Sequence, residues 1–290
     1  MDHPEYSVPP LSQGLSPALG APGRQRALGE VRARFERHGE RSRLARLYQT
    51  GGLRLATPNA AGAAEGVLIN TGGGMAGGDE ARLDFSVRAG AEVVLTTQSA
   101  EKIYRGETGA AHWRASIALD ASARLEWLPQ ETILFEGAKL ARRLNIDMAQ
   151  SAALLLAEVF TFGRTAFGED RIEASSRDSW RVRRAGKLVF AEELRLDGAA
   201  VLLPRPAIAG GARALASLLV IDADPASCLA RLRAAFEAAG ADGAAVEWGA
   251  SRVNETVVAR ALSPSPSHLR ATIVSVLARL RGRAAPRVWS

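Results

Sequence analysis

The sequence contains few of the residues that hold transition metals or form disulfides. It has one cysteine, Cys228, and four histidines among 290 residues. A single cysteine excludes a disulfide within the chain and fits a reducing compartment. No histidine has a second histidine or cysteine two to five residues away, although imidazole and thiolate sites usually show that spacing. We therefore expect no metal site of high affinity, and the histidines are His3, His38, His112 and His268.

Long apolar runs and a charged leader are also missing. No stretch of about 18 apolar residues occurs, which is the length a membrane-spanning helix needs. No positively charged start followed by an apolar run precedes Arg24, so we find no signal peptide. Residues 1–30 hold five of the 13 prolines and few bulky apolar side chains. We expect them to form a flexible tail before one domain at 31–290, in a cytoplasmic protein with no membrane partner.

Lysine is scarce as well, since it supplies only three of the 37 basic residues, and the other basic residues are arginine. The formal net charge is +6, which can steer acidic partners or nucleic acid. However, 31 acidic residues are interleaved with the basic ones, and the one basic cluster lies at 24–46. No series of aromatic residues offers bases a stacking platform. We expect no nucleic-acid partner, but a basic nucleic-acid-binding protein stays open as an alternative function.

Glycine is concentrated in the stretch NTGGGMAGGD at 70–79, where Gly72, Gly74 and Gly77 match the dinucleotide fingerprint G-x-G-x-x-G. That fingerprint works only where the loop leaves a strand and opens a helix. Here residues 66–70 suit a strand, but 82–88 alternate polar and apolar, which again indicates a strand. We interpret the loop as a long hairpin connection in which glycine permits positive φ. An NAD-type enzyme using the 72–77 loop is the second alternative.

The remaining pattern predicts an α+β fold that is predominantly β, with many short strands in stacked mixed or antiparallel sheets. A buried helix is expected near 151–163, because 152–160 contains helix formers and is apolar almost all round. Two further helices are expected near 225–239, with Asp224 as N-cap, and near 267–280, with Ser267 as N-cap. The C-terminal portion from about 213 should be α/β. One predicted strand face combines Leu140, Arg142, Leu144, Ile146 and Met148.

Carboxylates are the remaining candidates for chemistry, because neither a nucleophile elbow G-x-S-x-G nor a phosphate loop G-x-x-x-x-G-K-[ST] occurs. Glu158 and Glu169 fall on or after the predicted buried helix, where a charge needs a partner, and Arg164 suits at least one of them. The carboxylates are consistent with a paired acid/base site and also with a structural salt-bridge network. We expect no catalytic and no cofactor-binding residue.

Several short motifs occur in a characteristic order. They are GGG at 72–74 leading to GGD at 77–79, LTT at 95–97, KIYR at 102–105, LEWLPQE at 125–131 and GRTAFGE at 163–169. In order and spacing they resemble the urease accessory protein UreD, or UreH, family over about residues 30–290. One departure is Asn70-Thr71 before the glycines, where the family usually carries prolines. We expect this difference to loosen the loop.

The resemblance implies a maturation factor that is not an enzyme. Such β-rich scaffolds bind the urease apoprotein and the accessory protein UreF, which recruits the nickel-carrying GTPase UreG. The resemblance thus implies no cofactor of the chain's own, transient transfer of Ni²⁺, and GTP used by the partner. Oxygen ligands exchange Ni²⁺ more readily than imidazole or thiolate does.

Our hypothesis is that Asp79, Glu131 and Glu169, or a subset, line a hydrated nickel path. The competing interpretation is that they brace loops. The residues considered for a nickel path or interface are Asp79, Lys102, Tyr104, Arg105, Glu126, Glu131, Arg164 and Glu169.

Overall fold

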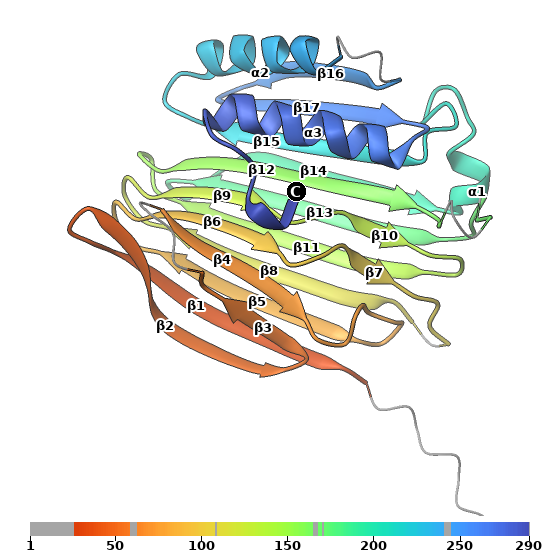
Figure 1. Cartoon of the computed structure of the whole chain (residues 1–290), viewed down its shortest axis with the longest axis horizontal. Coiled ribbons are helices and arrows are strands. Elements are labelled where there is room, and N and C mark those ends of the chain that lie inside the picture. Colours follow the sequence, from red (N-terminus) through yellow and green to blue (C-terminus); the bar gives the residue numbers. More distant parts are fainter. Residues whose placement is uncertain are drawn as a thin grey trace, which may run out of the picture.

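Two β-sheets stacked face to face make up most of the protein (Figure 1). The computed structural model describes residues 26–58, 63–107, 109–164, 168–169, 171–240 and 245–289. Sheet A has seven strands, in the order β14 (Lys187–Asp197), β13 (Ser175–Arg184), β11 (Lys139–Met148), β8 (Ala111–Leu119), β5 (Glu80–Val87), β1 (Leu28–His38) and β2 (Arg41–Gly51).

In the described part of the chain, sheet B has ten strands, and eight of them form a continuous series. Of the remaining two, β10 (Thr132–Leu134) pairs with β12, and β7 (Glu101–Ile103) pairs with β10. The series runs β16 (Glu247–Val253), β17 (Thr256–Ser263), β15 (Ala214–Ile221), β12 (Ala153–Phe162), β9 (Arg124–Leu128), β6 (Glu92–Thr97), β4 (Ala64–Asn70) and β3 (Leu53–Ala56). The prediction of a predominantly β protein is confirmed.

The chain crosses from one sheet to the other between consecutive strands through much of its length. As a result β4, β6, β9 and β12 are parallel neighbours in sheet B, and β1, β5, β8, β11 and β13 are parallel neighbours in sheet A. The glycine loop at 71–79 joins β4 to β5, so the predicted strand, loop and strand are confirmed. The predicted hairpin is wrong, because β4 and β5 belong to different sheets.

Two apolar cores result from this arrangement. The inner core lies between the sheets and includes Phe35, Phe85 and Trp127, all nearly inaccessible to solvent. The outer core lies between sheet B and the two long helices, α2 (Pro225–Gly240) and α3 (Pro266–Arg281), and includes Phe236 and Ile273. Figure 1 shows both helices on the outer face of sheet B, at its β15 to β16 end.

The helix predicted near 151–163 is wrong, because this segment is strand β12. β12 lies between the two cores: Leu156 and Phe160 face the inner core, whereas Ala157 and Val159 face the outer core. A strand that is buried on both faces carries a continuous apolar run instead of an alternating one. Periodicity alone cannot distinguish such a strand from a buried helix.

The other two predicted helices are confirmed. The Oδ1 of Asp224 accepts hydrogen bonds from the backbone N–H groups of Ala226 and Ser227 at the start of α2. At α3 the N-cap is Ser265 and not Ser267. Pro266 occupies the first helical turn, so the helix begins one residue before the predicted bound at 267. Two short helical segments, α1 (Ala199–Leu202) and η2 (Arg287–Trp289), complete the described elements.

At the N-terminus, strand β1 begins at Leu28. The last three residues of the predicted 1–30 tail therefore belong to sheet A, and residues 1–25 lie outside the described part of the chain. None of the helices formed by the described residues has both the length and the apolar character to cross a membrane.

Candidate functional site

Three charged side chains meet between the sheets, where almost every other side chain is apolar. Arg142 on β11 forms ion pairs with Glu158 on β12 and with Asp178 on β13, and its contact to Asp178 is 2.7 Å. All three side chains are at most 5 % exposed. Arg142 also donates through Nε to Asp178 (2.9 Å) and through Nη1 to Thr132 (3.3 Å). One buried guanidinium thus connects sheet A to sheet B.

Two indole N–H groups also donate to the carboxylates of this charged cluster. The indole N–H of Trp127 donates to Glu158 at 2.8 Å, and that of Trp180 donates to Asp178 at 3.1 Å. Burial raises the pKa of Glu158; Arg142 acts to lower it and Asp178 to raise it. Burial also acts to lower the pKa of Arg142, but the two carboxylates outweigh it and keep the guanidinium charged. With both carboxylates ionised, the cluster carries one net negative charge.

Two small cavities lie beside this cluster and have Thr97, Glu101 and Trp113 as common lining residues. The inner one, of about 30 Å³, reaches Arg142 and Glu158, and the outer one, of about 40 Å³, reaches Gly73 in the glycine loop. A water molecule needs roughly 10–15 Å³ measured in this way, so each cavity has room for water. The polar groups that line the two cavities form a row from the glycine loop at the surface to the buried charged cluster.

Glu101 lies where the two cavities adjoin. Burial raises the pKa of its carboxyl group to about 7, although a hydrogen bond from the side-chain N–H of Asn70 (2.9 Å) acts to lower it. The residue as a whole keeps some solvent exposure through the outer cavity. Near neutral pH, Glu101 therefore exchanges a proton and alternates between a neutral and a negatively charged oxygen donor.

The glycine loop is fixed by close contacts and is not loosened by the Asn70-Thr71 departure. Asn70 donates to the carbonyl of Gly74 (3.2 Å), and its own Oδ1 accepts from the N–H of Gly72 (3.0 Å). Gly74 has φ of +149°, and a Cβ there would lie 2.4 Å from the ring of Tyr104. Glycine is therefore required for backbone approach to an aromatic ring, and no helix follows that would hold a pyrophosphate.

Four of the predicted interface residues lie close to this loop. The ring of Tyr104 packs edge-on against that of Phe135. The guanidinium of Arg164 lies over the same Phe135 ring, 4.5 Å from its centre. Arg105 pairs with Glu136 at 3.6 Å. The carbonyl of Lys102 accepts from the N–H of Met75 at 2.8 Å. The ends of β7 and β10 thus form one surface with the glycine loop.

Asp79, Glu131 and Glu169 lie outside the lining of both cavities. Asp79 accepts from the N–H groups of Ala27 (2.9 Å) and Ala76 (2.8 Å). These contacts hold the start of β1 beside the loop.

The other two members of the proposed path are in ion pairs. Glu169 accepts from the backbone and the side chain of Arg164, which confirms the predicted pair, and Thr165, Ala166 and Phe167 between them lie outside the described residues. Glu131 pairs with Arg270 on α3 at 2.6 Å. Such contacts brace loops and helices; whether these carboxylates also affect nickel delivery stays a prediction.

Glu126 lies elsewhere, on the outer face of sheet B, where it pairs with Arg281 and Arg283. Gln130, in the same LEWLPQE motif, donates to the carbonyl of Val288 and accepts from Arg270. The polar residues of this motif therefore hold α3 and the C-terminal segment against the sheet. Its apolar residues belong to the two cores.

Sequence reasoning missed Glu101, Arg142 and Asp178 as site residues. Arg142 was visible as the one charged residue on an otherwise apolar strand face, which signals a buried ion pair. The partner of Glu158 is Arg142 and not Arg164. Neither Glu101 nor Asp178 has a comparable local signal.

Chemically, the residues that line the two cavities offer oxygen donors and no soft ligand. Within the described ranges, no group of three or more histidine, cysteine, aspartate or glutamate side chains is arranged to hold a metal ion. Carboxylates beside a cavity that has room for water suit weak, exchangeable contact with a divalent cation.

The two mixed sheets and the buried charged cluster define a β-rich protein, and a strand instead of a helix follows its glycine loop. The family model described as UreD urease accessory protein matches residues 27–290. The chain is 47 % identical over 276 residues to the urease accessory protein UreD of Methylobacterium sp. (strain 4-46), covering 94 % of this chain and 98 % of that protein.

A second relative, the urease accessory protein UreD of Beijerinckia indica, is 44 % identical over 268 residues, with 91 % and 97 % of the two chains covered. The corresponding protein of Rhodopseudomonas palustris (strain CGA009) is 41 % identical over 266 residues, with 91 % and 93 % covered. The chain therefore belongs to the UreD urease accessory protein family.

Proposed function

We propose that this chain is a urease maturation factor that bridges the urease apoprotein to the UreF and UreG accessory proteins and supports insertion of nickel. Membership of the UreD family supports the maturation role. The observation that carries the nickel role is the pair of adjoining cavities lined by Glu101 and Glu158.

Nickel is the cargo in this proposal. With Glu158 and Asp178 both ionised, the charged cluster has an excess of one negative charge, which attracts a divalent cation into a region where an uncompensated positive charge would be costly. Carboxylate oxygens and water release Ni²⁺ more readily than imidazole or thiolate. Glu101 is half protonated near pH 7, so it can release a proton when a cation arrives and take one up when the cation leaves.

The surface formed by Lys102, Tyr104, Arg105 and Arg164 is the proposed docking face at the outer cavity. Tyr104 is 39 % exposed although its ring packs against Phe135, and an exposed aromatic ring beside arginines is typical of interface centres. In this proposal the chain performs no catalysis and holds no cofactor of its own, GTP is used by the partner, and the work takes place in the cytoplasm.

Capture of the tagged full-length chain tests the bridging role. The chain is isolated from cells that also express the urease subunits, UreF and UreG, and the captured partners, the nickel content and the urease activity are measured. We expect apo-urease and both accessory proteins to be recovered, and urease to become active only when this chain is present. Urease that matures without the chain would refute the maturation role.

The double variant Glu101→Gln, Glu158→Gln tests the nickel path. Glutamine keeps the oxygens that accept from Asn70 and Trp127, so the fold and the captured complex should persist while nickel per urease falls. Glu247→Gln on the exposed edge strand β16 is the matched control and should leave nickel unchanged. Full nickel loading in the double variant would overturn the path while leaving the bridging role intact.

A second arm replaces Asp79, Glu131 and Glu169 with alanine. Because all three accept hydrogen bonds that hold loops or helices, loss of stability without loss of nickel transfer would assign them to bracing. Reduced nickel in a stable, complexed variant would extend the path to them.

A further inference from the structure

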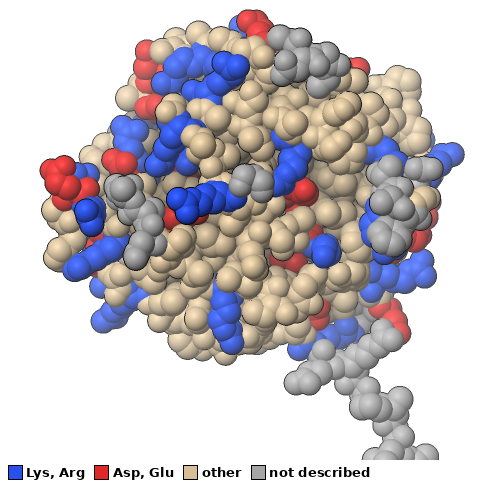
Figure 2. All heavy atoms as spheres, in the orientation of Figure 1, with Lys and Arg blue, Asp and Glu red and all other residues tan. Residues whose placement is uncertain are grey.

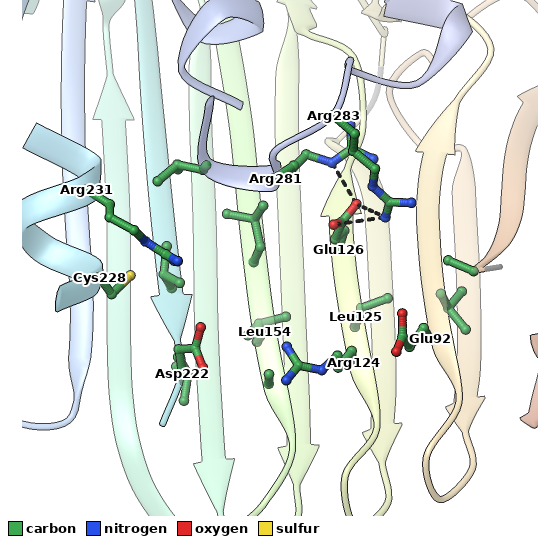
Figure 3. Close-up of a pocket in the computed structure, with 17 residues that line it drawn as sticks. Glu92, Arg124, Leu125, Glu126, Leu154, Asp222, Cys228, Arg231, Arg281 and Arg283 are labelled. Atoms are coloured by element: carbon green, nitrogen blue, oxygen red, sulfur yellow. Dashed lines mark hydrogen bonds and ion pairs between the residues drawn. The ribbon is translucent and has the colours of Figure 1, made fainter. Parts of the chain in front are cut away.

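A separate hollow lies on the outer face of sheet B, where α2 begins and α3 ends (Figure 3). Its volume is about 340 Å³, which falls within the range of roughly 300–1,000 Å³ typical of small-molecule sites. The first residues of β6, β9 and β12 and the last of β15 form its floor. It has no lining residue in common with the cavities between the sheets.

Four guanidinium groups line this hollow, from Arg124 on β9, Arg231 on α2, and Arg281 and Arg283 at the end of α3. Arg281 and Arg283 are held by Glu126, at 2.7 Å and 3.1 Å. Figure 3 shows both reaching the same carboxylate from one side of the hollow. Their charges are therefore partly compensated, and their positions are fixed.

Arg124 and Arg231 differ from that pair. Within the described ranges, neither forms an ion pair with a carboxylate, and Figure 3 shows both side chains extending over the floor of the hollow. The carboxylate of Asp222 accepts from the neighbouring N–H of Ala223 at 2.7 Å. Each guanidinium has five N–H donors in a fork that matches the oxygens of a carboxylate or phosphate.

The charge and the floor of the hollow favour an anion. Four arginines face three carboxylates, those of Glu92, Glu126 and Asp222, so one positive charge remains. The apolar side chains on the hollow's side of the sheet are those of Ala63, Leu155 and Val220, which keep the local dielectric low and strengthen attraction to an ion. Figure 2 shows basic side chains on this face over α2 and near the end of α3.

We propose that this hollow binds a small free oxyanion through Arg124 and Arg231. Its ligand is a carboxylate or phosphate group on a small molecule, held by charge-assisted hydrogen bonds. The proposal does not depend on the nickel path, because the two sites have no residue in common.

Isothermal titration of the full-length chain with sodium phosphate and with sodium acetate, at ionic strength kept constant with chloride, tests the proposal. We expect saturable binding of at least one of the two anions. Arg124→Gln and Arg231→Gln should each weaken it by at least about tenfold, because each removes a charged donor. Arg143→Gln, an exposed arginine on the outer face of central strand β11 in sheet A, is the matched control and should leave the affinity unchanged.

Three results would overturn the proposal. Heats that do not saturate at millimolar anion would show that no site exists. An equal loss of affinity in Arg143→Gln would show that the anions respond to the net charge of the protein and not to a site. Binding of a tetraglutamate peptide without binding of either small anion would show that the hollow takes a side chain of a protein partner. Because Arg124 and Arg231 are exposed, circular dichroism should report an unchanged fold in both variants.

Discussion

Replacing Glu101 with glutamine should make the protein more stable above neutral pH than the wild type is. The pKa of Glu101 is raised from 4.5 to about 7 in the folded state, chiefly by burial. Between these two values the folded state binds more protons than the unfolded state does, so the free energy of unfolding falls as pH rises. Glutamine resembles the protonated carboxyl group, and its oxygen still accepts from Asn70. The free energy of unfolding of the variant therefore does not fall in this way as pH rises.

The size of the effect follows from the pKa difference. At about 1.4 kcal/mol for each pKa unit, the difference corresponds to an upper limit of about 3 kcal/mol. Some solvent reaches Glu101 through the outer cavity and screens its charge, so we expect about 1–2 kcal/mol in the measurement. The whole effect should be present above about pH 8 and absent below about pH 4.

Urea unfolding of the wild type and the variant at several pH values measures this difference. The two proteins should unfold at similar urea concentrations near pH 4, and the variant should require more urea near pH 8. Glu247→Gln, an exposed change of the same chemistry, should stay within about 0.5 kcal/mol of the wild type at every pH. A variant that is destabilised equally at all pH values would refute the account, because Glu101 would then contribute through packing and not through its charge.

Three further predictions follow from the cores and the loop. Arg142→Met should cost about 3–5 kcal/mol in urea unfolding, because Glu158 and Asp178 lose their buried cation; a cost below 1 kcal/mol would contradict the buried pairing. Gly74→Ala should lower the midpoint of thermal unfolding more than Gly73→Ala, because an added Cβ meets the Tyr104 ring at 2.4 Å in the first case and nothing within 4 Å in the second. Trp289→Ala should cost about 3–5 kcal/mol, since this 3 % exposed side chain closes the outer core, and an unchanged midpoint would place it outside that core.

Local sequence signals were sufficient for elements that have one buried face or a clear cap. The hairpin of β13 and β14 turns at Ala185-Gly186, both with positive φ, and the glycine in this short connection is a local signal for such a turn. The start of α2 follows from Asp224-Pro225, and Cys228 on this helix is buried in the outer core. In each case the residues that determine the structure lie within a few positions of one another.

Local sequence signals did not predict the structure where a segment depends on residues far away in the sequence. The sequence of β12 resembles that of a helix, because a strand with a core on each face lacks the alternation of polar and apolar residues that marks a half-buried strand. The glycine loop does connect two strands, but the assignment of those strands to different sheets comes from their pairing with β6 and β8. Arg142 and Asp178 are 36 residues apart, so no local pattern could join them.

The buried charges also determine how the two sheets face each other. Glu158 lies on the inner face of β12 together with Leu156 and Phe160, so its side chain points toward sheet A. Moving β12 by one residue would turn every side chain to the opposite face and would carry the Glu158 carboxylate into the outer core, away from Arg142. An apolar side chain at 158 would tolerate either face, whereas a carboxylate is stable only beside its cation. The charged cluster therefore favours one register of β12 and, in that register, holds Glu158 against the inner cavity.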